Sequence, residues 1–275
     1  MTSRPELSTT DDARPNGTQR VILLGASNIT LAWPRIMALI QSGFSRSVEV
    51  YTAHGMGRSY CAERSGFAFR QLPGILRSDL WNVLPQGNNN DPPPTALITD
   101  LGNDLVYGSS PEEVAAATVE TVERIRSWNS ECRIAMTRPP VHSVNTLGSI
   151  RFMVCKAALF PFSGLRLPAV KTATLELDRK IVELADRLSI PLTATNSDWY
   201  GLDPIHVKRS RQTEAFSKYF EPWSLPENND SNPPNRRPLN GLTFRPTARL
   251  RWVWGTEKQT QQPVLTDGGF SVFAF

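Results

Sequence analysis

The sequence predicts an α/β fold in which a parallel sheet carries helices on both faces. Short apolar runs rich in β-branched residues, such as 20–26, alternate along the chain with longer segments of helical periodicity. The runs are apolar at successive positions, which is typical of strands buried on both faces. Strands that alternate with helices are joined as βαβ units, and such units make neighbouring strands parallel.

Five strands and four helices account for these segments. The expected strands are residues 20–26, 47–53, 95–101, 133–138 and 190–195. The expected helices are residues 30–43, 109–128, 173–189 and the end of 198–220. Ser110 is the predicted N-cap of the second helix, with Pro111 at its first position and Glu113 completing a capping box. Residues 141–170 are irregular in pattern, and a connection of this length is typical of a functional lid.

The composition divides the chain into three parts. Residues 1–18 are polar with both charge signs, so we expect a disordered N-terminal tail. Residues 19–221 hold the alternating strands and helices. Within 222–275, a Pro/Asn-rich linker leads to a segment that alternates apolar and polar residues like a β-hairpin. We interpret this last part as an appendage that covers a sheet edge, extends the pocket or mediates dimerisation.

Composition excludes several classes of protein. The net charge of +4 is a mild excess with no RNA- or DNA-binding motif beside it, so no nucleic-acid partner is expected. The three cysteines form no C-x-x-C pair, which predicts neither a zinc site nor a disulfide framework. The N-terminus lacks the apolar core of a signal peptide, and no apolar run is long enough to span a bilayer. We therefore expect a cytoplasmic protein with no membrane span.

Four of the strands are followed by residues that can carry chemistry. These residues are Ser27, Gly57, Asn103 and the loop from Asp203 to His206. In a parallel sheet, ligands bind beyond the carboxyl ends of the strands, where these segments converge on one rim. Each feature alone is more often a turn or a helix cap. Their common placement after strands is what indicates a site.

The histidines narrow the chemistry, because a general base near neutral pH is most often a histidine. The chain has three of them: His54, His142 and His206. Asp203 lies three residues before His206 and can orient its imidazole, while Ser27 can supply a nucleophile at the same rim. The Asn103 amide, the Gly57 N–H and the Ser27 N–H can donate to a developing oxyanion.

Four ordered blocks resemble those of the SGNH, or GDSL, hydrolase superfamily: "GASN" at Ser27, "HGMGRS" at Gly57, "GND" at Asn103 and "DPIH" at His206. The resemblance implies a flavodoxin-like, three-layer α/β/α sandwich with a five-stranded parallel sheet. It implies hydrolysis of ester or related acyl bonds without a metal or organic cofactor. Ser27 would be the nucleophile, His206 the base and Asp203 its orienting acid. The oxyanion hole would be formed by Ser27, Gly57 and Asn103.

The first block departs from the family pattern. Ala26 stands where the family usually has an aspartate that braces the nucleophile loop and is not the triad acid. Asn28 can supply a substitute hydrogen bond. The second block offers Gly55 as an alternative to Gly57. Candidates for lining the substrate pocket, with core packing as the alternative, are His54, Trp199 and Tyr200.

Other functions stay open. A degenerate SGNH-fold protein that binds an acylated or glycosylated ligand without cleaving it is favoured by Ala26. Phosphate or nucleotide binding is disfavoured, because "GASNIT" is not a glycine-rich cradle. Cys61 with His54 is a weaker nucleophile and base pair, and Asp100 with Asp104 lack a third metal ligand. The sequence does not specify the oligomeric state, or which small-molecule, carbohydrate or lipid ester is the substrate.

Overall fold

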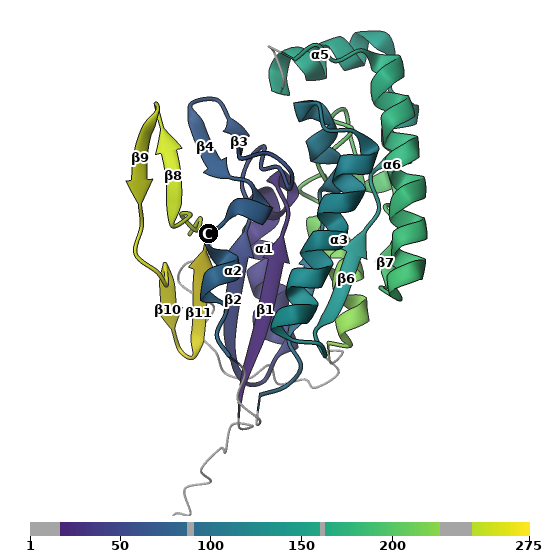
Figure 1. The fold of residues 1–275 in the computed structure, drawn as a ribbon. Helices are drawn as coiled ribbons and strands as arrows, with labels where there is room; N and C mark the ends of the chain where they lie inside the picture. The colour runs from purple at the N-terminus through teal and green to yellow at the C-terminus, as the bar shows by residue number, and fades with distance from the viewer. Residues whose placement is uncertain (1–16, 87–90, 160–162, 226–243) are drawn as a thin grey trace, which may run out of the picture.

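A seven-stranded sheet forms the centre of the computed structural model, which describes residues 17–86, 91–159, 163–225 and 244–275 (Figure 1). Its strand order is β10-β11-β2-β1-β5-β6-β7. The strands are β1 (Thr18–Leu24), β2 (Ser47–Ala53), β5 (Thr95–Ile98), β6 (Arg133–Thr137), β7 (Leu192–Thr193), β10 (Leu265–Asp267) and β11 (Phe270–Ala274). Every neighbouring pair is parallel except β10 and β11.

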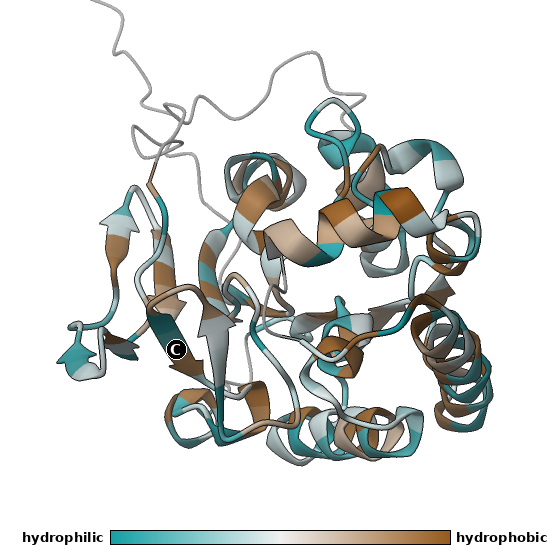
Figure 2. Ribbon diagram, turned by 90° about the horizontal axis from the view of Figure 1, so that it is seen from above, coloured by the Kyte–Doolittle hydropathy of each residue, from teal (hydrophilic) through white to brown (hydrophobic). Residues whose placement is uncertain are grey.

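Helices cover both faces of this sheet, as Figure 2 shows from above. Helices α1 (Ser27–Gly43) and α7 (Gln212–Phe220) pack on one face, and α3 (Pro111–Trp128) and α6 (Leu167–Leu188) pack on the other. The shorter elements are α2 (Leu80–Val83), α4 (Val141–Asn145), α5 (Ser149–Leu159) and 3-10 helices at Ile75–Arg77, Leu101–Tyr107, Ser197–Trp199 and Glu221–Trp223. The predicted three-layer α/β/α architecture is confirmed.

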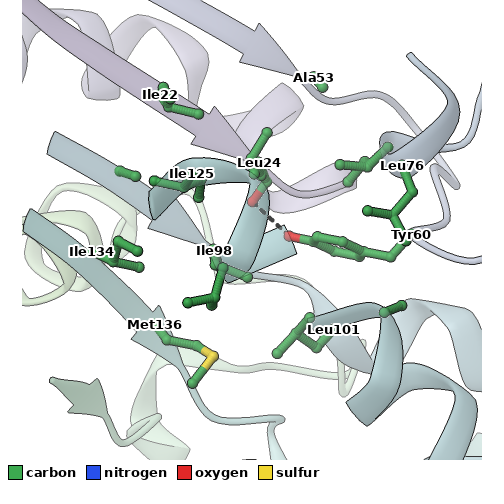
Figure 3. Close-up of a cluster of buried hydrophobic side chains, with 14 of the residues drawn as sticks. Ile22, Leu24, Ala53, Tyr60, Leu76, Ile98, Leu101, Ile125, Ile134 and Met136 are labelled. Carbon is green, nitrogen blue, oxygen red and sulfur yellow. Dashed lines mark hydrogen bonds between the residues drawn. The ribbon is translucent and has the colours of Figure 1, made fainter. Parts of the chain in front are cut away.

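Alternate side chains of β1 enter two different cores. Val21 and Leu23 pack with buried residues of α1 and α7, whereas Ile22 and Leu24 pack with those of α3 and α6. All four side chains are fully buried. Figure 3 shows the second core, including the Tyr60 hydroxyl that donates a 2.9 Å hydrogen bond to the Leu24 oxygen. A strand with a core on each side has no polar face, which explains its unbroken apolar run.

The sheet has seven strands rather than the five expected, because the C-terminal extension contributes two. β11 pairs in parallel with β2, and β10 pairs with β11. Phe270, Val272 and Ala274 are buried, so β11 covers a β2 edge that would otherwise be unpaired. The turn between β10 and β11 has positive φ at Gly268 (55°) and Gly269 (84°), which is the mirror-image hairpin turn that favours glycine.

The rest of the extension joins a second, four-stranded sheet of order β3-β4-β8-β9. β8 (Leu250–Val253) pairs with β9 (Thr256–Gln259) and with β4 (Arg70–Pro73), which forms a hairpin with β3 (Arg64–Phe67). The extension expected as one hairpin is therefore two hairpins in two sheets. Alternation along the sequence predicts strands, but the edge that each strand joins depends on contacts distant in sequence.

The segment expected as an irregular lid, residues 141–170, is mostly helical. Helices α4 and α5 lie within it, and α6 begins at Leu167. On α5, Ile150, Met153 and Val154 are more than half exposed. The helix therefore lacks the buried apolar stripe by which helices are recognised in a sequence.

The capping box predicted at the start of α3 is confirmed. The Glu113 N–H donates to Ser110 Oγ at 3.2 Å, and the Ser110 N–H donates to Glu113 Oε2 at 2.7 Å. The expected N-terminal tail, residues 1–18, lies outside the described residues except for Gly17 and Thr18. Across the described ranges, none of the helices combines the length and the apolar character needed to cross a bilayer.

We expect the extension to unfold together with the rest of the sheet. Val272 in β11 is fully buried, so Val272→Ala should lower the free energy of unfolding by about 2 kcal/mol. Lys258→Ala in β9, where every residue is exposed, serves as the control and should leave it nearly unchanged. Urea denaturation followed by tryptophan fluorescence measures both. A separate early transition for the extension would contradict this expectation.

Candidate active site

Three side chains from two distant parts of the chain form a hydrogen-bonded row at the carboxyl edge of the sheet. Ser27 is the first residue of α1 and is separated from the end of β1 by two residues, while His206 and Asp203 lie in the loop before α7. The Ser27 Oγ lies 2.7 Å from His206 Nε2, and His206 Nδ1 lies 2.5 Å from Asp203 Oδ2. The predicted convergence of these residues on one rim is therefore present.

The hydrogen-bond partners define the tautomer of His206. An ionised carboxylate only accepts, so Nδ1 carries the proton that is donated to Asp203. Nε2 is then the acceptor for the Ser27 hydroxyl. Burial raises the pKa of Asp203, but the His206 hydrogen bond and charge and the N–H groups of Ile205 and His206 outweigh it, and the net pKa is lowered. Asp203 therefore stays ionised at neutral pH.

A second carboxylate holds the nucleophile loop. Asp100 Oδ2 accepts the N–H of Ala26 at 2.8 Å and the N–H of Asn28 at 3.1 Å. These amides flank Ser27 at the positive end of the α1 dipole, where a negative charge is stabilised. Position 26 itself is an alanine, and the carboxylate beside Ser27 comes from the end of β5.

Asn28 ties the nucleophile loop to the histidine loop. Its Nδ2 donates to Asp100 Oδ1 at 2.7 Å and to the Ile205 oxygen at 3.0 Å, and its Oδ1 accepts the Val207 N–H at 2.9 Å. Ile205 and Val207 are the residues on either side of His206. The substitute hydrogen bond expected of Asn28 is thus part of a bridge between the two halves of the site.

From the sequence, Asp100 is a candidate metal ligand only, and its bracing role is not predicted. The residue is in the left-handed region (φ 62°), which is uncommon outside glycine and is best tolerated by Asp and Asn. Burial raises the pKa of Asp100. The hydrogen bonds from Asn28 and Ala26 and the charge of His206 lower this pKa, but they do not cancel the effect of burial. A polar residue at the end of an apolar strand was the available signal. Within the described ranges, no group of three or more His, Cys, Asp or Glu side chains is arranged to hold a metal.

The glycine loop after β2 and the 3-10 helix after β5 are joined through Asn103. Its Nδ2 donates to the Arg58 backbone oxygen at 2.7 Å, next to Gly57. Gly57 has φ 68°, and a Cβ there would lie 2.3 Å from Tyr107 Oη, so only glycine fits. A Cβ on Gly55 would lie 2.2 Å from Leu72 Cδ1. That atom is the end of a side chain, so the steric requirement for glycine is established at Gly57, and the choice between the two as oxyanion donor stays a prediction.

A cavity of about 80 Å³ opens beside the nucleophile. Its wall includes Ser27 and Asn103, together with the predicted pocket residue Tyr200. Trp199 is not on this wall: it is buried in the core and donates from Nε1 to Glu214 at 3.0 Å. His54 lies on another groove.

His54 is held as a neutral ring. The Thr52 hydroxyl donates to the Leu23 oxygen at 3.0 Å, so Thr52 Oγ1 accepts from His54 Nδ1, 2.7 Å away. The ring stacks on Trp33 with centroids 4.9 Å apart. Burial, together with the charges of Arg58 and Arg70, lowers the pKa of His54 to about 3.

Asp104 organises the loop that follows the glycines. Its fully buried carboxylate accepts the Ser59 hydroxyl, the Tyr60 N–H at 3.0 Å and the Cys61 N–H at 2.9 Å. Burial and the charge of Asp104 raise the pKa of Cys61 to about 12. Because the reactive form of cysteine is the thiolate, this loop disfavours Cys61 as a nucleophile.

Comparisons with known proteins were made on sequence and on structure. Neither a family model nor a curated protein matches the sequence. The structure is similar to a proposed GDSL-like lipase from Parabacteroides merdae (11% identity, TM-score 0.48, 77% of this chain and 99% of that chain). It is also similar to the aryl esterase of M. smegmatis (15%, 0.46, 75% and 99%). A third is a GDSL-like lipase from Bacteroides thetaiotaomicron (10%, 0.42, 75% and 87%). At such identities, the function has to be inferred from this chain's own site.

We expect Cys61 to react slowly with iodoacetamide. Raising its pKa from 9.0 to about 12 lowers the thiolate fraction at pH 8 roughly a thousandfold, and reactivity should keep rising with pH beyond 9. Site-resolved mass spectrometry of alkylated protein measures the rate, with free cysteine as the reference. A rate that levels off near pH 9 would show that the thiol is not shifted.

Proposed function

We propose that this protein is a serine hydrolase that cleaves an ester or related acyl bond. The observation that carries the proposal is the unbroken row from Ser27 Oγ through the His206 imidazole to the Asp203 carboxylate, with both hydrogen bonds at 2.7 Å or less. The acceptor nitrogen of His206 faces the Ser27 hydroxyl, and the Asp203 carboxylate lies on the other side of the ring. General-base activation of a serine requires this order of groups.

In the proposed reaction, Ser27 Oγ attacks the acyl carbon as its proton passes to His206 Nε2. Asp203 stabilises the imidazolium that results. His206 then returns the proton to the departing alcohol oxygen, which leaves an acyl group on Ser27. A water molecule attacks this acyl-enzyme as its proton passes to His206. The bond between the acyl carbon and Ser27 Oγ then breaks, His206 returns the proton to Oγ, and the acid product leaves.

The negative oxygen of each tetrahedral intermediate needs donors that are already in position. The candidates are the Ser27 N–H, the Gly57 N–H and Asn103 Nδ2. Asp100 accepts hydrogen bonds from the N–H groups of Ala26 and Asn28, which lie on either side of Ser27. These hydrogen bonds do not involve the N–H of Ser27 itself. The hydrogen bond from Asn103 to the Arg58 oxygen uses one of its two amide hydrogens, which leaves the other for an oxyanion.

We expect Ser27→Ala and His206→Ala each to lower kcat on short p-nitrophenyl esters by about a thousandfold or more. Asn103→Ala should cost about a hundredfold, since one oxyanion donor is lost. His142→Ala, an exposed histidine on α4, is the matched control. Fluorophosphonate labelling of Ser27 separates a hydrolase from a degenerate binding protein, because only an activated serine reacts. Wild-type turnover in the Ser27→Ala protein would refute the proposal.

We expect Asn28→Ala to slow acylation without removing any proposed catalytic atom. The substitution breaks the bridge to Ile205 and Val207, and loss of alignment of this kind typically lowers kcat by about tenfold to a hundredfold. KM should change less than kcat. The rate of fluorophosphonate labelling measures the alignment of Ser27 with His206. It is normalised to the amount of folded protein, which circular dichroism gives. Asn82→Ala on the exposed side of α2 is the control, and an equal effect of both substitutions would contradict the bracing role.

A further inference from the structure

A second groove borders the candidate site on the side of the glycine loop. It has a volume of about 370 Å³ and lies between residues 54–56 and the β3–β4 hairpin. Its walls include His54, Phe67, Phe69, Arg70 and Arg245.

The groove adjoins the proposed reaction centre on two sides. Gly55 and Met56, on its wall, directly precede Gly57. Thr30 is also on its wall, and its hydroxyl donates to the Ala26 oxygen at 3.1 Å, one turn along α1 from Ser27. A molecule with its acyl carbon at Ser27 and a second group in this groove would pass along the glycine loop.

Within the described ranges, the two arginines of the groove wall have no carboxylate partner. No Asp or Glu is among its wall residues. Within the described part of the chain, neither Arg70 nor Arg245 has a carboxylate oxygen within 4.0 Å. Arg70 and Arg245 share one groove wall, which sets them apart from single exposed arginines without an acidic partner elsewhere on the surface.

The charges behind the groove add to the same positive potential. Partial burial and the nearby Arg251 lower the pKa of Arg70. Arg58 is fully buried with backbone oxygens as its hydrogen-bond partners, those of Pro73, His54 and Phe275. Burial and then the charge of Arg70 lower the pKa of Arg58 to about 9. An anion in the groove would offset this repulsion among cations.

Aromatic rings flank the cations. Phe69 stacks on Trp254 with centroids 4.3 Å apart, although the two residues are 50% and 76% exposed. Phe69 lies between β3 and β4, and Trp254 lies between β8 and β9. These four strands form the small sheet at the upper left of Figure 1. A flat apolar face beside guanidinium groups suits the organic part of a small anion better than it suits a bare inorganic ion.

We propose that this groove is a subsite for an anionic oxygen group, a carboxylate or a phosphate, carried by the ester substrate away from its scissile bond. Arg70 and Arg245 would bind the anion, and Phe67 and Phe69 would pack against the carbon skeleton next to it. The inference rests on the proposed ester hydrolysis, and it identifies the substrate class as small anionic esters.

Binding without turnover tests the subsite independently of catalysis. Calorimetry on the Ser27→Ala protein would compare benzoate and phenyl phosphate, which separate the two anions, with neutral benzyl alcohol. We expect at least one of the two anions to bind. Its Kd should rise about tenfold or more when Arg70→Gln and Arg245→Gln are both introduced into the Ser27→Ala protein. Arg187→Gln, an exposed arginine of α6, removes the same charge elsewhere and should leave the Kd unchanged. Arg245 lies outside any strand, so the single variant Arg245→Gln still tests the subsite if the Arg70→Gln substitution in β4 impairs folding.

Kinetics of the catalytically intact protein complete the test. The ratio of kcat/KM for 4-carboxyphenyl acetate to that for phenyl acetate should fall about tenfold in the double variant and stay constant in Arg187→Gln. Anion binding in the Ser27→Ala protein without hydrolysis of any ester by the intact protein would reject the proposed function and keep the subsite. Hydrolysis of phenyl acetate with equal anion affinity in both arginine backgrounds would reject the subsite. Binding of heparin but of neither small anion would reject it as well.

Discussion

The partly buried Asp100 carboxylate is the group on which the geometry of the candidate site depends. It receives two backbone amides of the nucleophile loop and the side chain of Asn28, and Asn28 in turn binds both neighbours of His206. The ends of β1 and β5 and the loop before α7 are thereby fixed to one another. A buried anion is stable only when its acceptor sites are filled, so the positions of these three segments are mutually constrained.

The same principle governs the other wall of the site. Asp104, four residues further along, accepts the Ser59 hydroxyl and the amides of Tyr60 and Cys61, and this holds the loop that follows the glycines. Asn103 lies between the two aspartates and binds the Arg58 oxygen of that loop. One short 3-10 helix, Leu101–Tyr107, with the residue before it, therefore connects the segments that carry Ser27, His206 and the proposed oxyanion donors.

Sequence reasoning predicted the parts of the site that depend on chain order and residue type. Ser27, Asn103 and His206 follow predicted strands, and parallel strands bring their carboxyl ends together. Asp100 was not predicted in its bracing role, since that role requires a left-handed backbone and two amides that are more than 70 residues away in the chain. The parallel body of the sheet was predicted from its apolar runs. The addition of β10 and β11 was not, because an alternating pattern does not specify a partner edge.

The pairing of β11 with β2 links residues 270–275 to the rim of the candidate site. The Phe275 N–H donates to the Thr52 oxygen at 2.9 Å, and the Phe275 oxygen accepts from the buried guanidinium of Arg58, which adjoins Gly57. A hydrogen bond to a buried cation thus joins two segments that are more than 200 residues apart in the sequence. Displacing the segment that ends in Phe275 would remove an acceptor from a desolvated charge, so the position of this segment is coupled to the loop that carries Arg58 and Gly57.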